Sequence, residues 1–350
     1  MRSVIQYLKC MKNFVLSLFA IGIFATSFAQ SDSAAAFFTK GVEEKNARRY
    51  MVAYQNFQKA LQAKPDNIEY QKEAGFTALE LRRYAEARVH FEKVHQLKND
   101  DETAIAQLGQ INFSLRRWPQ AIQFAELMKQ KNIKGHNYIL GRSYYEEENY
   151  GEAYKYLQAA AKDDPNNGEI PYLIARSFVD MSNYKMAAKF FDEAIAKDSA
   201  KANWMYEAGL TYFAIPDAKT AIKYFEWAIA KGYKTSNDVL ENLSNAYVEA
   251  GQPQRGIELM KKLLEKKPAD MELLWNIAEA NYKTAKYAEA IEYWDRILYY
   301  DKAHAKSLYM IGLSYQKKGE KEKGQQLCDK AIEMDPSLKS LKQKKEMPGF

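Results

Sequence analysis

Residues 138–165 read YILGRSYYEEENYGEAYKYLQAAAKDDP and contain two small residues, Gly141 and Ala153, that stand twelve positions apart. Such a pair recurs nine times, at spacings of 34, 34, 32, 34, 34, 35, 34 and 34 residues. The first members are Gly41, Gly75, Gly109, Gly141, Ala175, Gly209, Ser244, Ala278 and Gly312; the second members are Ala53, Ala87, Ala121, Ala153, Ala187, Ala221, Gly256, Ala290 and Gly324. A fixed period of this length, with two helical patterns per period, predicts a stacked array in which each repeat buries its apolar face against its neighbours.

The small residues predict close contacts between helices. Glycine within a helix costs about 1 kcal/mol relative to alanine, so glycine at the first position needs a packing reason. Two antiparallel helices that cross at these residues would provide one. Large apolar residues such as Tyr144, Phe178 and Phe191 follow the small residues by three or four positions, which keeps them on the same helix face.

With these residues in place, the chain resembles the tetratricopeptide repeat family. The family pattern W-x2-L-G-x2-Y, then A-x3-F-x2-A, then P is matched almost completely by Leu140, Gly141, Tyr144, Ala153, Ala160 and Pro165. Other repeats depart from it, because Gly256 and Gly324 stand where alanine is usual. The resemblance covers residues 34–338 and implies an all-α fold. It would be an α-solenoid of about nine helix-turn-helix repeats in a right-handed superhelix, with repeats starting near residues 34, 68, 102, 134, 168, 202, 237, 271 and 305.

The two ends of the chain differ from the repeats. Basic residues precede an apolar run over residues 14–24, and small residues follow it up to Ala29, so we predict a signal peptide over residues 1–29 that is cleaved ahead of Gln30. The alternative is an uncleaved membrane anchor, although the run is shorter than the roughly 20 residues that span a bilayer. Met11 is an alternative start. Residues 339–350 form a basic C-terminal tail, either a cap on the last repeat or an arm for an anionic surface.

Composition argues against chemistry in a pocket. Residues 1–29 hold three basic and no acidic residues, so their removal lowers the net charge from +6 to +3, and we expect no nucleic-acid partner. Cys328 then remains alone, which excludes an internal disulfide and favours a buried apolar role. The histidines, His90, His95, His136 and His304, are scattered, and no phosphate loop or nucleophile elbow is present. We therefore expect no enzyme activity, no metal, no cofactor and no small-molecule substrate.

The resemblance implies that the first helix of each repeat lines the concave face. The residues that face inward would stand three positions before the first small residue and one and four positions after it. Those positions hold Tyr138, Arg142, Tyr145, Tyr172, Arg176, Tyr206, Phe213, Trp275, Tyr282 and Tyr309. Aromatic residues and arginine are enriched at binding hot spots, so we predict a groove for an extended peptide or a helix of a partner protein. The alternative is that the tyrosines pack against the next repeat and that Arg142 pairs with Glu146 on its own helix.

These features favour a non-enzymatic protein–protein interaction scaffold or adaptor, exported to the periplasm of a bacterium. A second hypothesis is a membrane-anchored assembly factor that recruits a secretion or envelope-biogenesis complex. In that case the apolar segment would be retained, and only then do we expect contact with a membrane. A third is an enzyme of the cell wall or its regulatory subunit, for which the sequence offers neither a site nor a signature.

Overall fold

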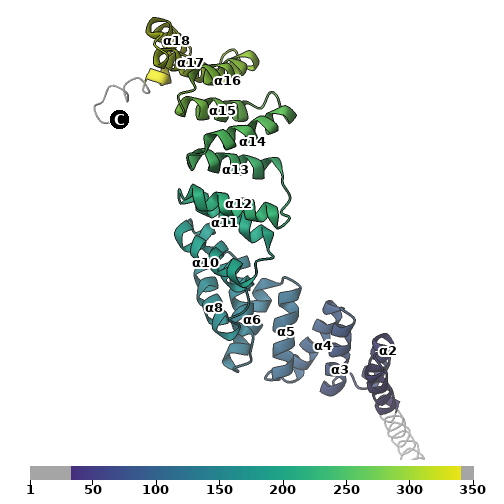
Figure 1. Cartoon of the computed structure of the whole chain (residues 1–350). Coiled ribbons are helices and arrows are strands. Elements are labelled where there is room, and N and C mark those ends of the chain that lie inside the picture. Colours follow the sequence, from purple (N-terminus) through teal and green to yellow (C-terminus); the bar gives the residue numbers. More distant parts are fainter. Residues whose placement is uncertain (1–32, 340–350) are drawn as a thin grey trace, which may run out of the picture. The chain divides into compact units, whose positions relative to one another are not determined.

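The computed structural model describes residues 33–339, and all regular structure within them is helical (Figure 1). The predicted signal peptide over residues 1–29 lies outside the described residues, as does the tail beyond Lys339. Helical residues 33–46 come first, and a short 3-10 helix over Pro336–Leu338 comes last.

Seventeen α-helices lie between these two segments. They are α2 (Tyr50–Ala63), α3 (Ile68–Glu80), α4 (Tyr84–Leu97), α5 (Glu102–Ser114), α6 (Trp118–Gln130), α7 (His136–Glu146), α8 (Tyr150–Asp163), α9 (Glu169–Asp180), α10 (Tyr184–Lys197), α11 (Ala202–Ala214), α12 (Ala218–Ala230), α13 (Asn237–Glu249), α14 (Pro253–Lys266), α15 (Met271–Lys283), α16 (Tyr287–Tyr300), α17 (Ala305–Lys317) and α18 (Lys321–Met334).

The helices fall into two compact units, which we describe separately. The N-terminal unit extends to Ser177, within α9, and the C-terminal unit begins at Phe178. In the N-terminal unit α3 packs on α4, α5 on α6 and α7 on α8, while α2 contacts α3, α4 contacts α5 and α6 contacts α7. The C-terminal unit repeats this arrangement from α11 to α18. Because each helix packs mainly on its neighbours in sequence, the predicted all-α, solenoid-like fold is confirmed.

The small residues lie where the two helices of a repeat touch. A β-carbon at Gly209 would lie 2.6 Å from Cδ1 of Phe225, and one at Gly75 would lie 2.8 Å from Cε2 of Phe91. Both rings are fully buried. These contacts explain why glycine is retained within helices where alanine has the better helix propensity.

The turn between the two helices of a repeat has the same backbone shape in one repeat after another. At Arg82 φ is +56°, and the amides of Arg82 and Arg83 donate to the carbonyls of Leu79 and Ala78, which is the Schellman pattern that ends a helix. Equivalent left-handed residues are Arg48, Arg116, Glu148, Ser182, Gly251, Ala285 and Gly319. This conformation costs a residue with a β-carbon about 1–2 kcal/mol, whereas glycine adopts it freely.

Candidate functional site

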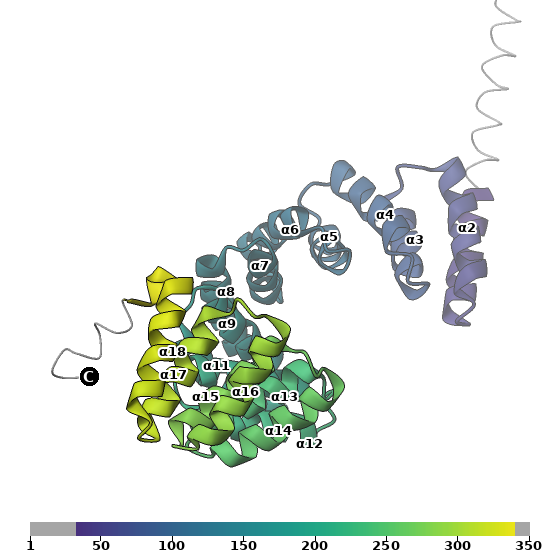
Figure 2. The same cartoon turned by 90° about the horizontal axis from the view of Figure 1, so that it is seen from above.

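In the N-terminal unit, the first helices of neighbouring repeats contact each other through partly exposed side chains. The ring centroids of Phe113 on α5 and Tyr138 on α7 lie 5.9 Å apart, and Figure 2 shows these two helices side by side. Arg142 on α7 reaches Glu169 on α9, with 2.9 Å between Nη1 and Oε1. The Arg176 guanidinium on α9 lies 5.8 Å from the Tyr145 ring centroid. We call this continuous surface over α5, α7 and the part of α9 up to Ser177 the first-helix face.

Arg142 is held by two carboxylates. Besides Glu169, its Nη2 lies 2.7 Å from Oε1 of Glu146, one turn along the same helix. The local pairing that the sequence left open as an alternative is therefore present, together with a second pair to the next repeat. Partly exposed ion pairs contribute little, typically 0.2–1 kcal/mol each, so a partner's carboxylate can compete for this guanidinium.

Tyr138 lies at the centre of the first-helix face. The pKa of its hydroxyl is raised above the ordinary range, mainly because the side chain is buried. The neighbouring Glu169 carboxylate accepts a hydrogen bond from this hydroxyl and raises the pKa further. The hydroxyl therefore stays protonated at neutral pH. Tyr172 and Tyr145 are half-buried, and Arg176 is exposed.

A pocket of about 580 Å³ lies beside Tyr138. Its floor is apolar and includes the buried residues Ile139 and Ile170, and its rim is polar and includes Lys134 and Asp163. The pocket adjoins the beginning of α7, which has 11 residues where α5 has 13. The first small residues Gly109 and Gly141 are 32 residues apart, whereas the other spacings are 34 or 35 residues. The pocket therefore lies where the repeat is two residues shorter.

The predicted residues of the C-terminal unit take part mainly in packing. The Tyr206 hydroxyl accepts a hydrogen bond from Asn242 at 2.8 Å, and the Tyr206 ring stacks on Tyr233. Phe213 packs against a buried core cluster. Tyr309 is only 3% exposed and offers little surface to a partner.

Two further predicted residues keep more surface. Trp275 is half-buried beneath Lys306, whose Nζ lies 4.3 Å from the Trp275 ring centroid. Tyr282 is half-buried between the rings of Tyr287 and Trp294. The five predicted residues of the N-terminal unit therefore lie on α7 and α9, within the first-helix face, and those of the C-terminal unit lie among packed side chains.

Sequence reasoning missed the apolar residues that extend the same offsets into the first three repeats. They are the half-buried side chains Phe38, Val42, Phe76, Leu79 and Phe113. All lie three before, one after or four after the first small residue of their repeat, so the same rule applied to the early repeats would have found them. Phe113 touches Tyr138 directly and so continues the first-helix face towards α3.

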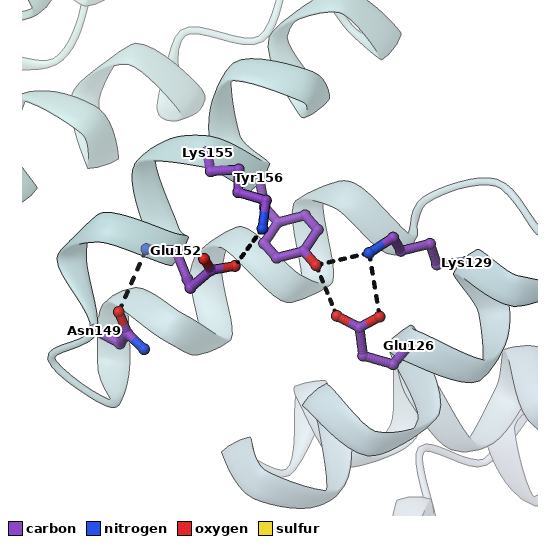
Figure 3. Close-up of polar contacts among 6 residues, drawn as sticks. All are labelled: Glu126, Lys129, Asn149, Glu152, Lys155 and Tyr156. Atoms are coloured by element: carbon purple, nitrogen blue, oxygen red, sulfur yellow. Dashed lines mark hydrogen bonds and ion pairs between the residues drawn. The ribbon is translucent and has the colours of Figure 1, made fainter.

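The second helices of the N-terminal unit carry a polar cluster that joins neighbouring repeats (Figure 3). The Tyr156 hydroxyl on α8 donates to Glu126 on α6 at 2.8 Å and accepts from Lys129 at 2.9 Å, while the Tyr144 and Tyr156 rings stack. In the C-terminal unit Asp192 likewise accepts from two tyrosines, Tyr212 and Tyr224. Since the groups in each cluster already bind one another, we interpret each Tyr–carboxylate cluster as a structural joint between neighbouring repeats of its own unit.

No arrangement suited to metal chemistry is found within residues 33–339, because no three His, Cys, Asp or Glu side chains gather at one place. His90 hydrogen-bonds with Tyr54 and Gln71, and Cys328 is buried, as expected from its place in the repeat. None of the helices in this part of the chain has the length and apolar character that a membrane crossing requires.

Comparison with sequence families identifies the class of protein. Profiles of the tetratricopeptide repeat match residues 172–233, 242–307 and 305–338, and the profile of the anaphase-promoting complex, cyclosome, subunit 3, matches residues 114–194. The chain is a tetratricopeptide repeat protein. Proteins of this family are generally protein-interaction scaffolds, and the family is typically non-enzymatic.

Several solved structures are similar to this chain. YrrB, described as a TPR protein with an unusual peptide-binding site, is 23% identical over 55% of this chain and 98% of its own, with a TM-score of 0.43. The pilF protein of Pseudomonas aeruginosa is 20% identical over 56% and 89%, with a TM-score of 0.37. The TPR domain of P58(IPK) is 14% identical over 90% and 99%, with a TM-score of 0.29. No curated protein matches the sequence.

Proposed function

We propose that this protein is a non-enzymatic scaffold that holds a peptide or a helix of a partner protein on the first-helix face. The observation that carries the proposal is the continuity of that face. Phe113 on α5 contacts Tyr138 on α7, and Arg142 and Tyr145 on α7 contact Glu169 and Arg176 on α9, so the contacts run across three successive first helices. Aromatic and arginine side chains of this kind contribute most of the energy at protein interfaces.

The chemistry of the face describes the partner. Phe113 on α5 offers apolar surface at one end of the face, while Arg142 on α7 and Arg176 on α9 offer guanidinium groups towards the other. A segment with apolar side chains followed by a carboxylate fits this order, since arginine binds carboxylates with two parallel hydrogen bonds. A helix or an extended strand can present such a series at regular intervals.

The protein acts, in this proposal, in the cell envelope of a bacterium after export. The signal-like pattern over residues 1–29 supports export, and the alternative is a membrane-anchored assembly factor that keeps this segment. Mass spectrometry of the N-terminus of the native protein separates the two. A mature chain that begins at Gln30 or within a residue or two supports export and cleavage, and an intact apolar segment in a membrane fraction supports the anchor.

Replacement of both Arg142 and Arg176 by alanine tests the binding face. We expect the double variant to bind the partner isolated by pull-down about 2 kcal/mol more weakly, which is roughly thirtyfold in Kd. Isothermal titration calorimetry gives this value directly. Double replacement by lysine keeps the charge but loses the bidentate geometry, so it should recover only part of the affinity.

The matched control is the pair Lys185→Ala and Lys219→Ala, which removes two exposed positive charges from second helices of the other unit. This control should bind as the wild type does. If the arginine variant also binds as tightly as the wild type, the partner does not use the first-helix face.

A further inference from the structure

Arginine doublets occupy the turns of the first three repeats. Arg48–Arg49, Arg82–Arg83 and Arg116–Arg117 lie 34 residues apart, each between the two helices of its repeat in the N-terminal unit. The first arginine of each doublet is exposed and has a left-handed backbone, with φ of +58°, +56° and +54°. We call the surface formed by these three turns the basic edge.

The backbone does not explain why arginine stands there. At the same place in the seventh and ninth repeats the chain has Gly251 and Gly319, for which the left-handed conformation carries no steric penalty. Three successive turns thus hold a strained arginine where glycine would be relaxed. Because Ser182 and Ala285 hold the same conformation, the backbone alone does not select arginine, and the exposed positive charge repeated at three successive turns is the feature that needs a use.

The three turns lie along one edge of the N-terminal unit. Repeats that stack in the same orientation, as α2 on α3 and α4 on α5 do, bring their turns to the same side. A direct contact joins the first two, because the Arg83 guanidinium lies 3.7 Å from Sδ of Met51 and 5.9 Å from the Tyr54 ring centroid. The basic edge ends at the fourth turn, which carries the exposed Glu147 and Glu148 instead.

Most of the positive charge on the basic edge is not neutralised by the protein itself. Arg49 pairs with Glu44, and Arg83 lies 3.4 Å from a carboxylate oxygen of Glu86. Arg48, Arg82 and Arg116 form no ion pair with any residue between 33 and 339. Their guanidinium groups therefore remain available for an anionic partner.

Aromatic and apolar side chains accompany the charges. An aromatic residue, Tyr50, Tyr84 or Trp118, follows each doublet directly. Tyr84 is 38% exposed, Met51 44% and Val52 40%, which is high for such side chains. Tyrosine, tryptophan and arginine next to exposed apolar groups match the region where lipid headgroups meet acyl chains, because each presents an apolar body and a polar tip.

From this arrangement we infer that the basic edge binds the anionic headgroups of a lipid bilayer and holds the N-terminal unit on a membrane surface. The arginines attract the headgroup phosphates, and Met51, Val52 and Tyr84 enter the headgroup region. Each basic residue near an anionic bilayer strengthens binding about fivefold. The basic edge shares no residue with the first-helix face, so the inference stands or falls independently of the proposed function. It also differs from a retained N-terminal segment as a route to the membrane.

Cosedimentation of the full chain with vesicles tests the inference. The probes are vesicles of phosphatidylcholine alone and of phosphatidylcholine mixed with phosphatidylglycerol. We expect binding to the anionic vesicles only, and weaker binding as salt is added. The variant R48G/R82G/R116G removes three charges and relaxes three turns, so it should fold at least as well and bind about a hundredfold more weakly. Circular dichroism verifies the folding.

Two control variants separate charge from backbone. Ser182→Gly with Ala285→Gly relaxes two turns of the same shape without a change in charge, and K185Q/K219Q/K231Q removes three exposed charges elsewhere. Both should bind the anionic vesicles as the wild type does. Since every variant carries the same residues 1–32, any contribution of that segment cancels in the comparison.

Three results would overturn the inference. The first is equal binding to neutral and anionic vesicles. The second is a triple glycine variant that binds as the wild type does. The third is retention of the protein on immobilised polyglutamate or heparin without any binding to vesicles, which would assign the basic edge to an acidic polymer.

Discussion

Replacement of Gly256 by alanine should destabilise the seventh repeat, although alanine is the better helix former. A β-carbon there would lie 2.5 Å from the carbonyl oxygen of Ser244 and 2.8 Å from Cγ2 of Val248. The first contact is with backbone, so α13 and α14 must move apart. Overpacking of this kind costs about 1–3 kcal/mol, and the gain in helix propensity returns about 1 kcal/mol. The expected net loss is about 1 kcal/mol.

Hydrogen exchange measured by mass spectrometry suits this prediction, because a repeat array can open locally without unfolding as a whole. A loss of about 1 kcal/mol should speed exchange of the α13 and α14 amides roughly fivefold. Gly151→Ala is the matched control. No side-chain or distant backbone atom lies within 4 Å of a β-carbon built there, so this change should leave α8 unchanged or slow its exchange. Unchanged or slower exchange in the Gly256 variant would show that α13 and α14 do not approach as closely as described.

Three further substitutions test the packing and its pH dependence. Ala187→Leu places a larger side chain at a fully buried crossing, so urea denaturation should show a loss of about 1–3 kcal/mol, and an unchanged midpoint would contradict the assigned crossing. Burial lowers the pKa of His90 below its ordinary value of 6.5, so protonation of this side chain favours the unfolded state. The stability of the folded state is therefore fully present above pH 6.5 and is lost as the pH falls through the lowered pKa. His90→Gln should flatten this pH dependence in melting curves. Tyr156→Phe removes the hydrogen bond to Glu126 and should lower the free energy of unfolding in chemical denaturation by about 1 kcal/mol. Phe190 stands at the equivalent position of the next repeat, so a phenylalanine ring fits there. An unchanged free energy of unfolding would mean that this hydrogen bond adds no stability.

The fold was readable from the sequence because every repeat obeys the same short-range requirement. Gly209 and Phe225 must fit together within one helix pair, and that requirement returns at each period. Surface groups obey no such rule. Arg142 meets Glu169, which lies 27 residues away at the beginning of the next repeat, and no local pattern announces the pair. Whether an aromatic residue is buried also depends on its neighbours, so Tyr309 is hidden although Tyr145 keeps part of its surface.

The Tyr–carboxylate joints set an alkaline limit on the protein. Burial, followed by the hydrogen bond to Glu226, raises the pKa of Tyr247 from its ordinary value of 10.0 to about 12, and burial together with Asp192 raises the pKa values of Tyr212 and Tyr224. The unfolded chain ionises first, so these hydroxyls stabilise the folded state below about pH 10 and cease to do so as the pH rises through their folded pKa values. In strong base, the tyrosinate absorbance that belongs to Tyr212, Tyr224 and Tyr247 should therefore appear together with the loss of helix rather than before it.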